Sequence, residues 1–278
     1  MDLNTVEQLV PASGRASVDA FAPGDAWLAG GSGLFAAPNP SLRRLLDLHA
    51  LDWPPLTATA DGLEIAATCT IAQLAAYAAP TRWPALGIVR ACCESLRGSF
   101  KVWHVATVGG NVCVGLPAGP MTSLTAGLAG TCRIWQPGGG DRVAAVADVV
   151  IGDGRTSLAP GELLRSITLP AAALRGRAAM RQASLTPMGR SAALLVARLD
   201  EPHGARGGGA FHLTITASVP RPRTLRFAGG VPSSAELDAA IEQALAPGDY
   251  FDDPHGTPRW RRHLTRRLAR ELRDELAA

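Results

Sequence analysis

Clustered and alternating apolar positions in the first part of the chain predict short strands and helices in mixed order. The apolar stretch that begins at Asp25 runs into a glycine turn, and a short amphipathic element follows at 41–48. Residues 62–68 predict a strand, and residues 70–78 predict a helix for which Thr70 is a favourable N-cap. Both kinds of element are therefore expected within one domain.

The next stretch continues this mixed pattern. Residues 83–96 predict a helix, residues 105–110 a strand that ends in paired glycines, and residues 120–129 an apolar helix. Two further short segments are predicted at 143–150 and 163–169. Strands and helices alternate without a repeat of fixed period.

The composition changes at residues 171–177, AAALRGR, which we interpret as a domain boundary. Downstream, the pattern predicts strands at 179–184 and 211–219, helices at 191–199, 235–246 and 258–277, and a flexible turn at 201–209. The last helix has an apolar stripe formed by Trp260, Leu264, Leu268, Leu272 and Leu276. Its arginines lie on the other face, where Arg270 and Asp274 are one turn apart. We expect a solvated helix that packs on its own domain.

Composition and charge exclude several classes of protein. The 278 residues are 47% hydrophobic and 18% charged, which is enough for one large domain or two ordinary ones. The formal net charge is only +3, with Lys101 as the single lysine, so nucleic-acid binding is not indicated. No apolar run approaches the roughly 18 residues of a membrane-spanning helix, and no signal peptide is visible. We expect a soluble, cytoplasmic protein that contacts neither membranes nor nucleic acid.

The cysteines and histidines do not predict a metal site. The five cysteines are Cys69, Cys92, Cys93, Cys113 and Cys132, and none forms a CxxC pair. The six histidines show neither HxH nor HExxH spacing. We expect free thiols in a reducing compartment, and no iron-sulphur cluster on this chain.

Two glycine motifs are the candidates for ligand binding. The first is AGGSGL at 29–34, and the second lies in ATVGGNVCVGLPAGP at 106–120. Glycine lets the backbone approach a ligand closely and turn several N–H groups toward one anion, which suits a diphosphate. Neither motif is GxGxxG or a P-loop. A pair of purely structural turns in a chain with 30 glycines is the alternative.

These motifs, with PGELLRSITLP at 160–170 and MRQASLTPMGRSAALLVA at 180–197, resemble the flavin-binding medium subunit of the molybdenum hydroxylases. That is the xanthine dehydrogenase and carbon monoxide dehydrogenase family. The resemblance covers nearly the whole chain and implies an α+β fold. It implies a two-lobed FAD-binding domain of the vanillyl-alcohol oxidase (PCMH) type at 1–172, with lobes at about 1–55 and 56–172. A smaller C-terminal α+β domain of the CO dehydrogenase flavoprotein type is implied at 178–278.

The resemblance also implies which residues contact FAD, which this family binds non-covalently. Backbone N–H groups of the two motifs hold the diphosphate and need no lysine. The contacts carry over to Ala29, Gly30, Gly31, Ser32, Gly33 and Leu34, and to Ala106, Thr107, Gly109, Gly110, Asn111 and Cys113. Leu164 is placed near the flavin ring, and Arg181 where a cation could stabilise the anionic reduced flavin; an exposed arginine is the simpler alternative.

The sequence departs from the family pattern at two places in the second motif. Pro120 stands where the family often has an Asp, which puts one FAD contact in doubt. Trp103 and His104 replace the usual Arg-Asn before the motif. We interpret His104 as a packing histidine rather than a covalent flavin attachment site.

The function implied by the resemblance is electron transfer. A molybdenum cofactor and iron-sulphur clusters on partner subunits would supply electrons, and FAD on this chain would pass them to NAD, oxygen or another acceptor. The expected assembly contains an iron-sulphur subunit and a molybdenum-cofactor large subunit in equal number with this chain, a heterotrimer. No catalytic residue and no metal ligand are predicted on this chain. The alternatives are a free-standing FAD-dependent reductase or oxidase on the same fold, and a flavin-less assembly scaffold.

Overall fold

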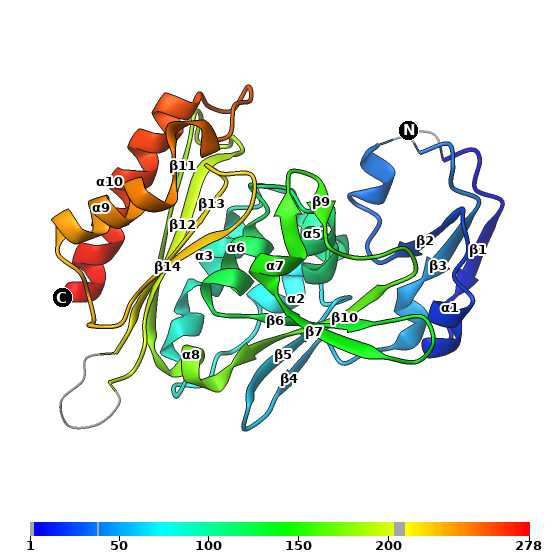
Figure 1. Ribbon diagram of the computed structural model, residues 1–278. Helices are drawn as coiled ribbons and strands as arrows, with labels where there is room; N and C mark the ends of the chain where they lie inside the picture. Colours follow the sequence, from blue (N-terminus) through cyan, green and yellow to red (C-terminus); the bar gives the residue numbers. More distant parts are fainter. Residues whose placement is uncertain (1–2, 38, 203–208) are drawn as a thin grey trace.

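The computed structural model describes residues 3–37, 39–202 and 209–278. Its N-terminal part is a small parallel sheet with strand order β1-β3-β2 (Figure 1). The elements of this part are β1 (Gln8–Pro11), α1 (Arg15–Asp19), β2 (Asp25–Leu28), the 3-10 turn η1 (Leu34–Ala36), β3 (Arg44–Asp47) and the 3-10 turn η2 (Leu48–Leu51). The predicted amphipathic element at 41–48 is therefore mainly the central strand of this sheet.

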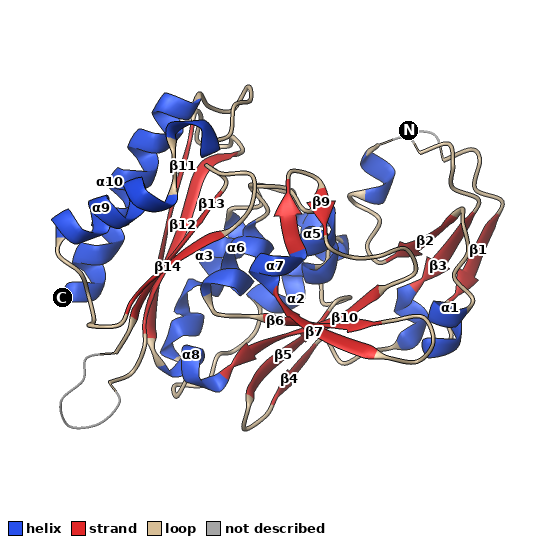
Figure 2. Ribbon diagram, in the orientation of Figure 1, coloured by secondary structure: helices blue, strands red, loops and turns tan. Residues whose placement is uncertain are grey.

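The middle part is an antiparallel sheet of five strands in the order β4-β5-β10-β6-β7. These strands are β4 (Leu56–Ala58), β5 (Gly62–Ala66), β6 (Thr131–Trp135), β7 (Asp141–Ala145) and β10 (Leu163–Pro170), and a small ribbon pairs β8 (Val150–Gly152) with β9 (Arg155–Thr156). One face of the sheet is covered by helices, and the buried side chains of Ile65, Ile134 and Ile167 pack under them (Figure 2).

The helices of the middle part are short. They are α2 (Ile71–Ala75), the 3-10 turn η3 (Pro84–Ile88), α3 (Val89–Glu94), α4 (Phe100–Val105), α5 (Val108–Val114), α6 (Pro120–Gly127), α7 (Val146–Val149) and α8 (Ala171–Arg175). Thr70 caps α2 in a capping box with Gln73, as its position predicted. α6 is buried on every side, and the hydroxyl groups of its Ser123 and Thr125 form hydrogen bonds inside the protein.

The C-terminal part is a four-stranded antiparallel sheet flanked by two helices on one face (Figure 1). Its elements are β11 (Arg177–Ser184), β12 (Ser191–Leu199), β13 (Phe211–Thr216), β14 (Arg223–Phe227), α9 (Ser234–Ala244), the 3-10 turn η4 (Pro247–Asp249) and α10 (Pro258–Ala277). Along β12, Leu195 and Ala197 pack in the core formed with α10, whereas Leu194 and Val196 pack in the core of the middle part. This sheet therefore lies between two layers of helices.

Two sequence predictions of secondary structure are wrong. Residues 191–199 form a strand rather than a helix, because β12 is buried on both faces and so lacks the polar alternation of a half-exposed strand. Residues 105–110 form no strand: α4 ends at Val105, and Thr107 then caps α5. The predicted turn at 201–209 falls mostly on residues outside those described.

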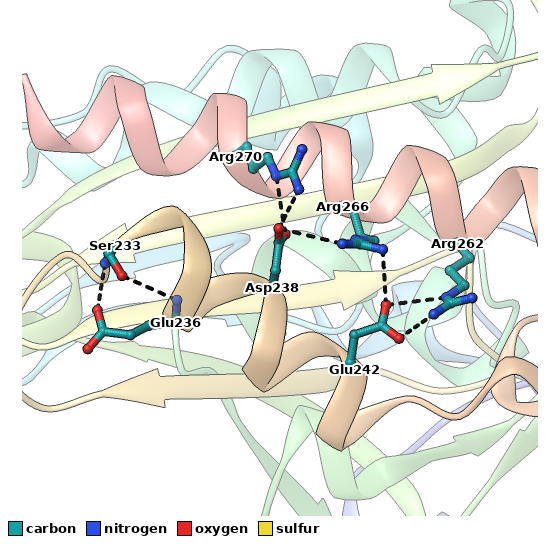
Figure 3. Close-up of polar contacts among 7 residues, drawn as sticks. All are labelled: Ser233, Glu236, Asp238, Glu242, Arg262, Arg266 and Arg270. Carbon is teal, nitrogen blue, oxygen red and sulfur yellow. Dashed lines mark hydrogen bonds and ion pairs between the residues drawn. The ribbon is translucent and has the colours of Figure 1, made fainter.

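The last helix has the predicted buried stripe, but its arginines pair differently. Leu264, Leu268, Leu272 and Leu276 are all buried against the sheet. Arg270 pairs with Asp238 of α9 rather than with Asp274, and Arg266 lies 3.6 Å from Asp238 Oδ2 and 3.4 Å from Glu242 Oε1 (Figure 3). Glu242 also pairs with Arg262. The arginine face of α10 thus fastens α9 to the domain.

No helix within the described residues is long and apolar enough to cross a membrane. All five cysteines are free, and Cys69, Cys92, Cys93 and Cys132 are buried. Burial raises the pKa of the Cys69 and Cys132 thiols to about 12, which keeps them protonated and unreactive at neutral pH.

Candidate functional site

The first glycine motif forms an open turn after β2. Gly31 has a φ of 70°, a left-handed conformation that glycine adopts without strain. Within the described part of the chain, the backbone N–H groups of residues 30–34 have no hydrogen-bond acceptor. Ser32 and Gly33 are exposed. Consecutive unpaired N–H groups in such a turn form a concave site for an anion.

The second glycine motif is the first turn of α5, and its N–H groups are already bonded. Gly110 donates to Thr107 Oγ1 at 3.0 Å, and Gly109 donates to the carbonyl of Ala67 at 3.1 Å. Val108 and Asn111 also donate to backbone carbonyls. This differs from the expectation that both motifs offer backbone N–H groups: here Thr107 and Ala67 compete with any ligand for those of residues 108–111.

Asn111 gives the second motif a different donor. Its Oδ1 accepts from the backbone N–H of Met121 at 3.0 Å, which orients the amide and leaves its NH₂ group without an acceptor among the described residues. The same bond holds the start of α6, where Pro120 occupies the first helical position. Proline has no carboxylate, so Pro120 cannot make the FAD contact that the Asp often found at this position would make.

The two motifs lie against each other. A Cβ on Gly30 would lie 1.4 Å from the carbonyl oxygen of Val105, so only glycine allows this approach. A Cβ on Gly33 would lie 2.9 Å from Cγ2 of Val114, at the other end of α5. The fold therefore brings together the free donors of residues 30–34 and the helix that carries Asn111.

The other predicted contacts are placed as follows. Ala29 packs in a cluster between the N-terminal and middle parts, and Ala106 is buried next to the second motif. Cys113 is exposed on α5. Leu164, with 2% of its surface exposed, belongs to the same buried cluster as Val108 of α5. Leu164 is thus a core residue beneath the second motif.

Arg181 is not brought to the glycine motifs. It points from β11 toward α10, where it pairs with Glu275 at 2.5 Å and lies 3.7 Å from Glu271. Alternation along the strand places Arg181 on the same face as Ala179 and Ala183, which pack with the C-terminal core. Arg181 therefore joins the sheet to α10, and its contact with the flavin ring stays a prediction.

His104 is not a packing histidine as predicted. Its ring is exposed, and Nδ1 lies 2.7 Å from the carbonyl oxygen of Phe100 one turn earlier. Because a carbonyl only accepts, Nδ1 carries the proton. Trp103 is the residue that packs inward, and its indole N–H is buried without a partner among the described residues.

Glu162 accepts several hydrogen bonds that connect distant segments, and the sequence analysis did not predict this role. Its carboxylate accepts from Arg142 Nη2 at 2.7 Å, from the N–H of Ala159 at 2.9 Å and from Gln136 Nε2 at 3.1 Å. Arg142 is the main cause that lowers the pKa of Glu162 to about 2. The backbone carbonyl of Glu162 accepts from the indole N–H of Trp27 at 3.1 Å. Since Trp27 lies just before the first glycine motif, Glu162 ties that motif to β10.

A carboxylate inside the apolar PGELL segment was the available signal for Glu162. A charged side chain seldom stays next to buried leucines unless it is paired. Leu163 and Leu164, which follow it, are both buried. The identity of the partner, Arg142, depends on the pairing of strands distant in sequence.

The C-terminal part contacts the turn after α5 through Ala217, which a buried arginine supports. The carbonyl of Pro117 accepts from the N–H of Ala217 at 2.8 Å, and Ala217 has a φ of 62°. Arg261, 1% exposed, donates to the carbonyls of Ala217 and Ala192 and pairs with Asp253. Arg261 therefore holds the strained residue that anchors this turn.

The described residues thus offer free N–H donors for an anionic group at the first glycine motif. Among the described residues, no group of three or more His, Cys, Asp or Glu side chains is placed to hold a metal ion. The chain matches the family described as the FAD binding domain in molybdopterin dehydrogenase over residues 9–172. It belongs to that family, and the resemblance seen in the sequence is confirmed.

Solved structures agree with this assignment at the level of the fold. Quinoline 2-oxidoreductase from Pseudomonas putida 86 matches with a TM-score of 0.79 and 20% identity, covering 100% of both chains. The cyanide-inactivated form of Cu,Mo-CO dehydrogenase matches with a TM-score of 0.82 and 21% identity, over 99% of this chain and 98% of that one. A carbon monoxide dehydrogenase from Hydrogenophaga pseudoflava that lacks the Mo-pyranopterin moiety gives 0.81 and 17%, over 99% and 98%. No curated protein matches the chain.

The site fits the cofactor that the family implies. The unpaired N–H groups of residues 30–34 and the free amide of Asn111 suit a diphosphate, and Gly30 and Gly33 keep the backbone accessible. The chain is an FAD-binding protein of the molybdopterin dehydrogenase family, and the predicted α+β class is confirmed, with an FAD-binding domain consistent with the PCMH type.

Proposed function

We propose that this chain is the electron-transfer subunit of a molybdenum-containing hydroxylase or dehydrogenase. Electrons would come from iron-sulphur clusters of one partner subunit, after substrate oxidation at a molybdenum cofactor on another. They would leave this chain for NAD, oxygen or another acceptor. We further propose one copy of each subunit per assembly, with a boundary in this chain between residues 172 and 178. Bound FAD supplies the redox chemistry, because it exchanges electrons singly or in pairs.

The residues of this chain would bind and orient the cofactor. The observation that carries the proposal is the run of unpaired N–H groups at residues 30–34. Each charge-assisted bond from such a group to a phosphate contributes about 1.5–3 kcal/mol. Asn111 would add a neutral donor from α5. Because Glu162 and Arg261 fix the segments on either side, the donors are held in place before the ligand arrives.

Two substitutions at Gly33 test the donor role. Gly33 has a φ of −83°, close to the value that proline adopts, so Gly33→Pro removes the N–H with little change of the backbone. Gly33→Ala introduces the same Cβ next to Val114 but keeps the N–H. We expect Gly33→Pro to bind FAD at least about tenfold more weakly than Gly33→Ala. If a fluorescence titration finds equal FAD affinity for the two variants, the N–H group of Gly33 does not donate to FAD.

The two alternative functions make different predictions for the purified chain. A flavin-less scaffold would show no flavin absorption after incubation with FAD. A free-standing reductase or oxidase would turn over an organic substrate without partners. We expect the chain to bind FAD and accept electrons from a chemical reductant, yet to oxidise no aldehyde or purine alone. Co-purification from the native host, with identification of both partners, tests the assembly.

A further inference from the structure

The outer face of the middle sheet, opposite its helices, is only partly covered. Figure 2 shows the helices on one side of β4-β5-β10-β6-β7. The N-terminal part covers one end of the other side, where Leu163 and Trp135 pack with Val18 and Leu48. Beyond that end, Arg133 is exposed, and 68% of the surface of Val143 is exposed directly opposite it on β7. We call this area, with Arg165, the outer sheet face.

Arg165 lies at the border of the outer sheet face and has no anionic partner. Its guanidinium stacks on the indole of Trp53 at 4.1 Å and lies 6.0 Å from the ring centre of Trp135. Among the described residues, no carboxylate forms an ion pair with Arg165 or with Arg133. By contrast, Arg142, Arg198 and Arg261, which are also partly or fully buried, each pair with a carboxylate.

No ion pair within the described residues neutralises the positive charge at this face, although Glu64 of β5 acts on Arg165. Burial is the main cause that lowers the pKa of Arg165; Glu64 acts in the opposite direction, and Arg133 lowers it further. Two guanidinium groups therefore repel each other while one of them is partly desolvated. A carboxylate from outside the chain would offset both the repulsion and the burial of the charge. Stacking on Trp53 already holds the guanidinium group of Arg165 in one plane.

A second feature at the same position also lacks a partner. Ser166 follows Arg165 and pairs directly with Arg133 across the sheet. Its hydroxyl is fully buried and has no hydrogen-bond partner among the described residues. Buried hydroxyl groups are usually satisfied. A bulge between Leu164 and Ser166 leaves Arg165 outside the regular pairing of β10 with β6.

We propose that the outer sheet face docks an acidic segment of a partner protein, with Arg165 and Arg133 as its anchors. A protein is favoured over a small anion because the guanidinium groups stand on the pleated face of a sheet beside the exposed Val143, and not within a cavity lining. Arginine, tryptophan and an exposed aliphatic side chain together are the composition of interface centres. This inference does not depend on FAD binding.

The test measures binding of a fluorescein-labelled decaglutamate peptide to the full chain by fluorescence anisotropy. We expect saturable binding that decaglutamine does not show. Arg165→Gln and Arg133→Gln should each weaken it about tenfold. Arg259→Gln, which removes one charge from an exposed position on α10, should leave it unchanged. Arg133 is exposed, so its variant keeps the result interpretable if Arg165→Gln destabilises the fold.

Three outcomes would overturn the proposal. The first is equal binding of decaglutamate and decaglutamine. The second is wild-type affinity in both the Arg165 and Arg133 variants. The third is displacement of the peptide by millimolar phosphate beyond the effect of sodium chloride at the same ionic strength, since that would identify a small-anion site instead. If Arg165→Gln and Arg133→Gln both bind FAD as the wild type does, the outer sheet face acts independently of the cofactor site.

Discussion

Replacing Glu162 by Gln should destabilise the fold strongly at neutral pH and hardly at all in acid. The carboxylate accepts four hydrogen bonds, three of them from Arg142 and Gln136 and one from Ala159. A glutamine side chain of the same shape keeps at most part of this set and none of the charge. The variant therefore removes mainly the interaction with Arg142 and disturbs packing little.

The magnitude follows from the pKa of Glu162. Its carboxyl group has an ordinary pKa of 4.5, and in the folded chain the pKa is lowered to about 2. Each pH unit of difference corresponds to about 1.4 kcal/mol, so the ionised form stabilises the fold by about 3 kcal/mol. Only 5% of the side chain is exposed, so solvent screens the interaction weakly.

The pH dependence has a defined sign. Because the pKa is lower in the folded state, the unfolded chain takes up the proton first as the pH falls below 4.5. The stabilisation is complete above pH 4.5 and is lost progressively down to about pH 2. Other carboxylates titrate in this range, so the quantity to follow is the difference between wild type and Glu162→Gln.

Urea unfolding of both proteins between pH 7 and pH 2.5 measures this difference. It should be about 3 kcal/mol at pH 7 and should shrink toward zero at the acid end. Glu94→Gln is the matched control, because Glu94 pairs with Arg90 on the exposed surface of α3 and should cost less than about 1 kcal/mol. A difference that stays constant with pH would refute the electrostatic reasoning and assign the effect to packing.

Three further predictions concern the site and its supports. Gly30→Ala should abolish FAD binding, since its Cβ would lie 1.4 Å from the Val105 carbonyl oxygen; a cofactor titration that finds normal affinity would contradict the contact between the motifs. Arg261→Met should lower the free energy of unfolding by about 3–5 kcal/mol because Asp253 loses its buried partner, and urea denaturation checks this. Cys69 should resist iodoacetamide at pH 8 until the chain is denatured, because burial raises its pKa to about 12; rapid labelling of native protein, seen by mass spectrometry, would count against it.

Local patterns determined several elements correctly. The helix at 258–277 agrees with its predicted bounds because one amphipathic stripe and a Thr257 cap act within the helix itself. The capped helix after Thr70 follows for the same reason, since its capping box is local. For residues 163–169 the pattern predicted a short segment without its type, and it is the strand β10. The two glycine motifs could be recognised because glycine is needed there, at Gly31 for a left-handed φ and at Gly30 for a close approach to Val105, and glycine is visible in the sequence.

Tertiary structure decided what local patterns leave open. Residues 191–199 become a strand because layers on both faces bury them, and an apolar run does not reveal how many faces are covered. The position of α10 against the sheet gives Arg181 its partners Glu271 and Glu275, which the sequence pattern did not indicate. Whether an N–H group is free or bonded depends on acceptors far along the chain, such as Ala67 for Gly109. The resemblance seen in the sequence therefore indicated the cofactor class, and the glycine motifs as its binding residues stay a prediction. Packing of distant segments alone decides which backbone N–H groups stay free and which charged side chains lack an ion pair.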